Sequence, residues 1–153
     1  PDEFAAEGVK SLDLAVRSFN RMVYAAMPEA GVVGKVTRYG KVLPSVRPGN
    51  ETRAIGGLAW DQVNDRLVVL YAEDGEIVVY EDETQPVTRV KLQAGLDAWS
   101  LAYDSNRQRY YVPLLEVGWL GEFDAEGRLI GRLPLPQSVG GIDAGQRAFV
   151  RVF

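Results

Sequence analysis

A chain of 153 residues with 46% hydrophobic content is long enough to form one domain with its own core. Its net charge of −4, without any run of basic residues, excludes the electrostatic signature of a nucleic-acid binder. Cysteine and histidine are absent, which excludes disulfides, thiolate catalysis, a Ser-His-Asp triad and His-ligated zinc, and leaves the compartment open. The longest fully apolar stretch, residues 67–72, is far shorter than the roughly 20 residues that span a bilayer, so no membrane insertion is expected.

Three stretches of the chain resemble one another. After residues 1–10, which we interpret as an N-terminal extension, each copy has a short apolar segment, a polar turn, and an apolar run that follows an arginine. These arginines, Arg21, Arg66 and Arg109, are 45 and 43 residues apart. A period in the low forties that is filled with short strands and turns is typical of a four-stranded propeller blade. The repeat therefore predicts an all-β protein of the β-propeller class.

The second copy, over residues 54–93, shows the four strands of a blade most clearly. Strands are predicted at 57–61, 66–71, 76–80 and 87–92. The Asn-Asp and Asp-Gly pairs between them are hairpin signals, because these residues tolerate the positive φ that tight turns need. Short strands joined in this way form an antiparallel meander.

The second and third strands of this copy are apolar on both faces, whereas the fourth alternates between apolar and basic residues. Middle strands of a blade are covered by neighbouring blades, and the outermost strand is an exposed edge. We therefore expect Val90 and Leu92 to face inward, and Arg89 and Lys91 outward. We also expect a buried core from the central strands of the second and third copies: Leu67, Val69, Ile77, Val79, Tyr110, Val112 and Leu120.

The third copy, over residues 98–136, repeats the scheme, and a half blade over residues 138–153 holds two strands. With a first blade at residues 11–48, the prediction is fourteen strands in about three and a half four-stranded antiparallel blades. Natural propellers close with about four to eight blades, so this ring is incomplete. We therefore expect another chain, or a further segment of a longer chain, to complete the ring.

Two runs of residues carry a family resemblance. The run Gly57-Leu-Ala-Trp-Asp61, followed by an apolar strand, and the run Phe123-Asp-Ala-Glu-Gly-Arg-Leu-Ile130 resemble repeats of the NHL type and of related six-bladed propellers of bacteria. In those families the repeat begins with Gly, an aliphatic residue and Ala, and it closes on Phe-Asp, Gly and a basic residue. The resemblance covers residues 11–153. It implies a binding scaffold more often than a lactonase, a lyase or another enzyme.

The loops that join the outer strand of one blade to the inner strand of the next should converge at the mouth of the central channel. They carry Arg53, Asp97, Trp99 and Gln137. Binding residues often lie on loops that a rigid scaffold holds, and Trp with Arg is common in interface hot spots. We interpret these four as candidate partner-binding residues. The alternative is that Trp99 fills a gap between blades and that the charged residues only line the rim.

Three glutamates, Glu29, Glu73 and Glu116, follow the second strand of successive copies and suggest a carboxylate ring for a hard cation. Packed sheets are about 10 Å apart, however, whereas Ca–O distances are about 2.3–2.6 Å. We therefore expect solvated turn residues. Neither a metal nor an organic cofactor is expected, and Ca²⁺ is the only ion that remains a candidate.

Several other residues have a structural role as their first interpretation. Asp61 and Asp104 are expected to cap the turn that follows the inner strand. Trp60 and Tyr103 should pack between blades. The glycine pair at 56–57 lacks the Lys-Ser/Thr of a phosphate loop, so close strand packing near the propeller axis explains it better.

The favoured hypothesis is a non-enzymatic propeller scaffold that binds a protein or peptide partner through its inter-blade loops, or serves as a subunit of a larger assembly. The alternative is a piece of a propeller enzyme, such as a metal-dependent lactonase or lyase. Enzymes of that kind place several polar side chains at the channel mouth. Here Leu58, Leu101 and Ile142 dominate the inner strands, with only Asp97 and Asp143 close, which favours binding.

Overall fold

The computed structural model describes residues 13–136, 142–144 and 150–152, and this part of the chain forms fourteen β-strands. Three four-stranded antiparallel sheets follow one another, each with its strands in chain order. The first contains β1 (Leu14–Arg17), β2 (Met22–Ala26), β3 (Val33–Val36) and β4 (Val42–Val46); the second contains β5 (Ile55–Asp61), β6 (Arg66–Tyr71), β7 (Glu76–Glu81) and β8 (Gln85–Lys91); the third contains β9 (Ala102–Asp104), β10 (Arg109–Pro113), β11 (Trp119–Phe123) and β12 (Leu129–Pro134). A 3-10 turn, η2 (Pro48–Asn50), precedes β5, and β13 (Ile142–Ala144) pairs with β14 (Val150–Val152). The all-β prediction is confirmed.

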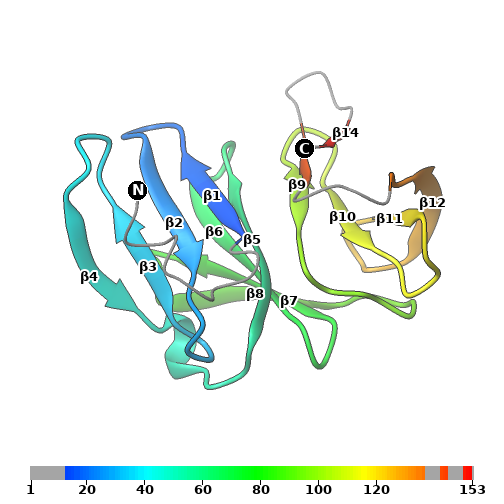
Figure 1. The fold of residues 1–153 in the computed structure, drawn as a ribbon, viewed down its shortest axis with the longest axis horizontal. Helices are drawn as coiled ribbons and strands as arrows, with labels where there is room; N and C mark the ends of the chain where they lie inside the picture. Colours follow the sequence, from blue (N-terminus) through cyan, green and yellow to red (C-terminus); the bar gives the residue numbers. More distant parts are fainter. Residues whose placement is uncertain (1–12, 137–141, 145–149, 153) are drawn as a thin grey trace.

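The sheets pack face against face, as the blades of a propeller do (Figure 1). The innermost strands β1, β5 and β9 contact one another in succession, and β13 continues the series beside β9. Much of the half blade that the sequence predicts lies outside the described residues. Within the described part, no helix is long and apolar enough to cross a membrane.

Strand pairing corrects the alignment of the repeats. The hairpins pair Asp61 with Arg66 and Asp104 with Arg109, and the equivalent pair in the first sheet is Arg17 with Met22. The prediction that aligned Arg21 with the other two arginines is therefore wrong by one residue. The last residue of each turn adopts a left-handed backbone with a φ of 56°: Arg21, Asp65 and Gln108.

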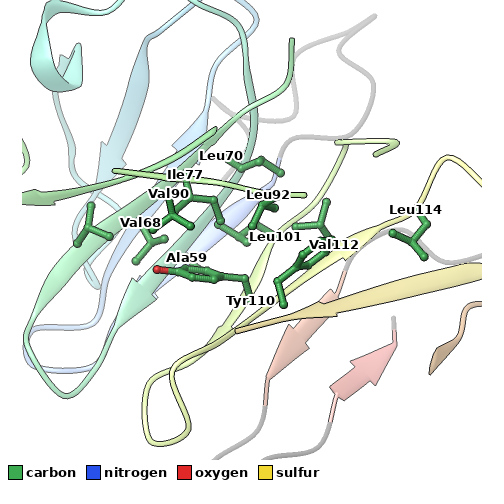
Figure 2. Close-up of a cluster of buried hydrophobic side chains, with 12 residues drawn as sticks. Ala59, Val68, Leu70, Ile77, Val90, Leu92, Leu101, Tyr110, Val112 and Leu114 are labelled. Carbon is green, nitrogen blue, oxygen red and sulfur yellow. The ribbon is translucent and has the colours of Figure 1, made fainter. Parts of the chain in front are cut away.

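Two clusters of buried side chains hold the sheets together. Between the first and second sheets, the rings of Tyr24 and Trp60 stack with centroids 4.9 Å apart and an interplanar angle of 18°. Between the second and third sheets, Ile77 and Val90 meet Val112 in the cluster that Figure 2 shows. All seven predicted core residues are at most 7% exposed. Burial of apolar side chains on both faces of the second sheet is therefore the main source of stability, at about 25 cal/mol per Å².

Other structural predictions are also confirmed. Tyr103 packs against the cluster between the second and third sheets, with its ring centroid 4.9 Å from that of Tyr110. On the edge strand, Val90 and Leu92 are buried whereas Arg89 and Lys91 are exposed. An outer strand with one charged face is protected against pairing with other chains.

The inner-strand aspartates cap their turns, as predicted. Asp61 Oδ1 accepts hydrogen bonds from the backbone N–H groups of Val63 and Asn64, at 3.0 and 3.1 Å. Asp104 Oδ1 accepts equivalent bonds from Asn106 and Arg107, at 3.1 and 3.2 Å. Both carboxylates thus satisfy turn donors within their own hairpin.

The glycine pair of β5 lies where the second sheet meets the third. A Cβ at Gly56 would collide with the backbone oxygen of Ala98, and a Cβ at Gly57 would lie 2.6 Å from the backbone nitrogen of Leu101. Only glycine permits so close an approach between two backbones. The close-packing interpretation is confirmed.

Candidate functional site

The meander gives the protein two unlike ends. We call the end with the β2–β3, β4–β5 and β8–β9 connections the loop face, and the opposite end, with the β1–β2, β3–β4 and equivalent turns, the turn face. Three of the four candidate binding residues lie on the loop face. The fourth, Gln137, lies outside the described residues.

Arg53 lies in the β4–β5 connection, where carboxylates surround it. Its Nη2 is 2.6 Å from Glu51 Oε2 and 3.0 Å from Glu76 Oε1, and its Nη1 is 2.7 Å from Asp74 Oδ2. The guanidinium carbon stands 4.1 Å from the ring centroid of Tyr71. The hydrogen bonds that Arg53 donates to Glu51 are the main reason that the pKa of Arg53 rises above its ordinary value. Arg53 is therefore a fixed cation that orders the loop face from within.

This network extends over the second sheet. Arg89 Nη1 lies 3.7 Å from Glu51 Oε2 and 3.5 Å from Glu76 Oε1, so two of the three carboxylates around Arg53 are shared with Arg89. Next to it, the hydroxyl oxygens of Tyr71 and Tyr80 are 2.6 Å apart and buried. Burial raises the pKa of both phenols. The two arginines and three carboxylates leave one negative charge in excess, and Lys91 Nζ donates to the backbone oxygen of Asp74 beside them.

Asp97 and Trp99 lie in the β8–β9 connection, which the third sheet holds in place. The backbone N–H of Asp97 donates to the oxygen of Pro113 at 2.9 Å, and Leu96 forms an isolated bridge with Leu114. Asp97 is exposed and Trp99 is half-buried. Neither side chain makes a hydrogen bond or an ion pair within the described part of the chain.

A half-buried carboxylate that the sequence interpretation missed lies where the inner strands begin. Asp13 Oδ2 accepts the backbone N–H of Leu58 at 2.9 Å and that of Leu101 at 3.1 Å, and its Oδ1 accepts the hydroxyl of Ser100 at 3.0 Å. One side chain thus connects the inner strands of all three sheets. Burial raises the pKa of Asp13 from 3.8 to about 6, and the hydrogen bonds offset only part of that shift.

A sequence signal for Asp13 existed. With the corrected alignment, Asp13 occupies the position that Gly57 and Ser100 hold in the other copies. A carboxylate in place of a small residue, one position before an apolar inner strand, indicates a polar contact near the axis. The sequence does not reveal that the carboxylate oxygens of Asp13 contact two other sheets, because those contacts join residues 45 and 88 positions apart.

The geometry of this site gives it a structural role more readily than a chemical one. Ser100 is 1% exposed, and the carboxylate oxygens of Asp13 already accept two backbone N–H groups. The Ser100 hydroxyl lies in the packed interior, and the half-buried Asp13 carboxylate is engaged by three donors. The pair is therefore best described as a link between blades.

The three glutamates that follow the second strands do not converge. Glu29 and Glu116 pair with Arg47 and Arg132 of their own sheets, at 3.0 and 2.5 Å, and Glu73 is exposed. Across residues 13–136 and the two short C-terminal strands, no group of three Asp, Glu, His or Cys residues is placed to hold a metal ion. The turn-residue interpretation is confirmed.

Comparisons with known proteins agree with this architecture. The chain resembles a protein of unknown function from Bacteroides caccae, with a TM-score of 0.66 and 12% identity over 96% of this chain and 54% of that one. It also resembles a catalytically inactive virginiamycin B lyase from Staphylococcus aureus with quinupristin, with a TM-score of 0.62 and 16% identity over 96% and 50%. Hydrazine synthase from Kuenenia stuttgartiensis is similar as well, with a TM-score of 0.61 and 13% identity over 94% of this chain and 43% of that one.

At such low identity these similarities establish the fold alone. The fold is that of a β-propeller, and three blades with half of another are an incomplete ring, as predicted. The chain spans about half of the length of these propeller-like proteins. No family model matches it, and neither does any curated protein, so the NHL-type assignment stays a prediction.

Proposed function

We propose that this chain is a non-enzymatic propeller scaffold that binds a protein or peptide partner through its loop face. The proposal rests on a contrast between the candidate binding residues of the loop face. Arg53 is held by three carboxylates, whereas Asp97 and the half-buried Trp99 are free of such contacts in the described part of the chain. A rigid base with an available aromatic and an available carboxylate suits a binding surface.

The charge of the loop face indicates the chemistry of the partner. Glu73 and Asp97 are exposed and form no ion pair with another described residue, and the Arg53 network has an excess of carboxylates. A complementary segment would carry lysine or arginine beside an apolar residue that contacts Trp99. This favours a basic peptide.

Peptides selected from a random display library on the purified chain test this proposal. We expect enrichment in Lys and Arg, and at least about tenfold weaker binding of the selected peptides to Trp99→Ala and Asp97→Lys. Tyr39→Ala, on the turn face and 81% exposed, is the matched control and should bind as the unmodified chain does. The proposal would be contradicted if the selected peptides bound Trp99→Ala and Asp97→Lys as tightly as the unmodified chain.

The enzyme alternative keeps one supporting observation, because virginiamycin B lyase is among the proteins of similar fold. The residues near the axis favour the scaffold instead. The Asp13 carboxylate accepts three hydrogen bonds, and the inner strands continue from the equivalent positions with the apolar residues Leu58 and Leu101. We therefore place the lyase or lactonase function second.

We further propose that additional propeller blades pack against the first sheet. Leu14 and Val16, on the face of β1 that turns away from the second sheet, are 52% and 50% exposed. An inner strand with apolar residues on both faces suits a position between two blades. The native particle should therefore have a mass above the 16.9 kDa of this chain, whether through a second chain or a longer one. A stable native monomer of 16.9 kDa in sedimentation would refute this proposal.

A further inference from the structure

In the three four-stranded sheets, the turns between the first two strands are joined side by side on the turn face. The backbone N–H of Ser18 donates to Gln62 Oε1 at 3.0 Å, and the backbone N–H of Gln62 donates to Ser105 Oγ at 3.0 Å. Gln62 Nε2 also donates to the oxygen of Val16 at 2.9 Å. These three residues, Ser18, Gln62 and Ser105, hold the same position in successive turns. The three turns therefore form one hydrogen-bonded row on the turn face.

Two apolar side chains project from this surface. Phe19 is 85% exposed and Val63 is 60% exposed, and each is the next residue after the hydrogen-bonded position of its turn. Arg17 lies with its guanidinium carbon 5.6 Å from the Phe19 ring centroid and forms an ion pair with Asp65 of the neighbouring turn. Single exposed apolar residues are common on proteins. Here two of them lie in adjacent turns that hydrogen bonds and an ion pair join.

In the described β1–β2, β5–β6 and β9–β10 turns, the exposed charges that lack an ion pair are positive. Arg21 and Arg107 are exposed, and neither forms an ion pair within the described part of the chain. The carboxylates of these turns are engaged: Asp65 pairs with Arg17, while Asp61 and Asp104 are buried and cap their own turns. On a protein with a net charge of −4, this is a local basic region.

We propose that Phe19, Val63, Arg21 and Arg107, here called the turn-face patch, bind an acidic segment of a partner protein. An apolar side chain of that segment contacts Phe19 and Val63, while its carboxylates pair with the two arginines. Arginine binds carboxylates through two parallel hydrogen bonds, which gives such a contact orientation as well as attraction. Two separate arginines around an apolar pair suit a peptide better than a nucleic acid, which requires a longer basic track.

The patch lies at the opposite end of the blades from Asp97 and Trp99. The inference therefore goes beyond the proposed loop-face function and does not depend on it. Together, the turn-face patch and the loop face would let one propeller hold two partners of opposite charge.

A fluorescein-labelled peptide with a Leu-Phe pair between two Glu-Glu pairs tests the proposal by fluorescence anisotropy on the unmodified chain. A peptide with lysine in place of each glutamate is the comparison. The acidic peptide should bind at least about tenfold more tightly, and its affinity should fall as ionic strength rises from about 0.05 to 0.3 M. Equal binding of the two peptides would overturn the proposal, as would tighter binding of a labelled oligothymidine or assembly of the chain with itself through this face.

Matched variants locate the binding. Arg21→Glu combined with Arg107→Glu should weaken the acidic peptide at least about tenfold, whereas Lys41→Glu, an exposed charge reversal in the β3–β4 turn, should change it less than about twofold. Phe19→Ser should weaken binding as well, unlike Tyr39→Ser. All of these residues are exposed, so thermal melts should be unchanged. An equal loss in Lys41→Glu would overturn the assignment to the turn-face patch.

Discussion

Asp13→Asn is expected to be more stable than Asp13→Ala by about 2–6 kcal/mol, as measured by urea unfolding. Alanine leaves the backbone N–H groups of Leu58 and Leu101 without their acceptor, and an unsatisfied buried donor costs about 1–3 kcal/mol. Asparagine keeps an oxygen for both donors and directs its amide toward Ser100. Because neither variant ionises, this difference should not vary with pH.

The unmodified chain should lose stability relative to Asp13→Asn as pH rises from about 4 to about 6. Burial raises the pKa of the Asp13 carboxyl group from 3.8 to about 6, so the folded protein retains a proton that the unfolded chain releases in this range. The stability that the protonated group provides is complete below about pH 4 and is lost above about pH 6. The change amounts to at most about 3 kcal/mol.

The exposed Asp97 on the same face provides the control. Asp97→Asn, which leaves the Asp13 carboxyl group in place, should show the same fall in stability between pH 4 and 6 as the unmodified chain. Unfolding curves in which Asp13→Ala and Asp13→Asn coincide would show that the link between the inner strands does not stabilise the propeller.

The strands of the propeller were predictable because local signals determine them. The second sheet follows from Asp-Gly and Asn-Asp turns and from apolar runs that need neighbours on both faces, and its strand β6 agrees with the prediction at both ends. The edge strand followed from the alternation of Val90 and Lys91. The alignment of the first copy failed at Arg21, since a left-handed turn residue and a strand residue look alike in sequence when both follow a polar turn.

The site was less predictable because it depends on contacts between distant residues. That Arg53 lies on an inter-blade loop follows from its place between two blades, but its carboxylate partner Asp74 comes from the turn of another hairpin. The Asp13 link joins residues up to 88 positions apart. The exposure of Phe19 depends on which end of the strand the turn occupies, and this is known only once the blade order is known. Sequence reasoning places residues on elements, whereas the partners of a charge require the packed sheets.

Ile77→Ala is expected to lower the free energy of unfolding by about 2–4 kcal/mol, because the truncation removes buried surface and leaves a cavity. Ile77 is 0% exposed, lies in the cluster between the second and third sheets, and pairs across the strands with Leu70 and Val90. Close packing there leaves the surrounding side chains little room to fill the void, since rigid strands hold them on both sides. The measurement is urea denaturation monitored by tryptophan fluorescence.

Val87→Ala is the matched control, because Val87 lies on the adjacent outer strand and is 41% exposed. Its truncation should cost less than about 0.5 kcal/mol, as surface substitutions usually do. A loss below about 0.5 kcal/mol for Ile77→Ala as well would mean that the second and third sheets do not form a shared core. Because the same interface holds the β8–β9 connection in place, a large loss would also explain why Asp97 and Trp99 keep a fixed position on the loop face.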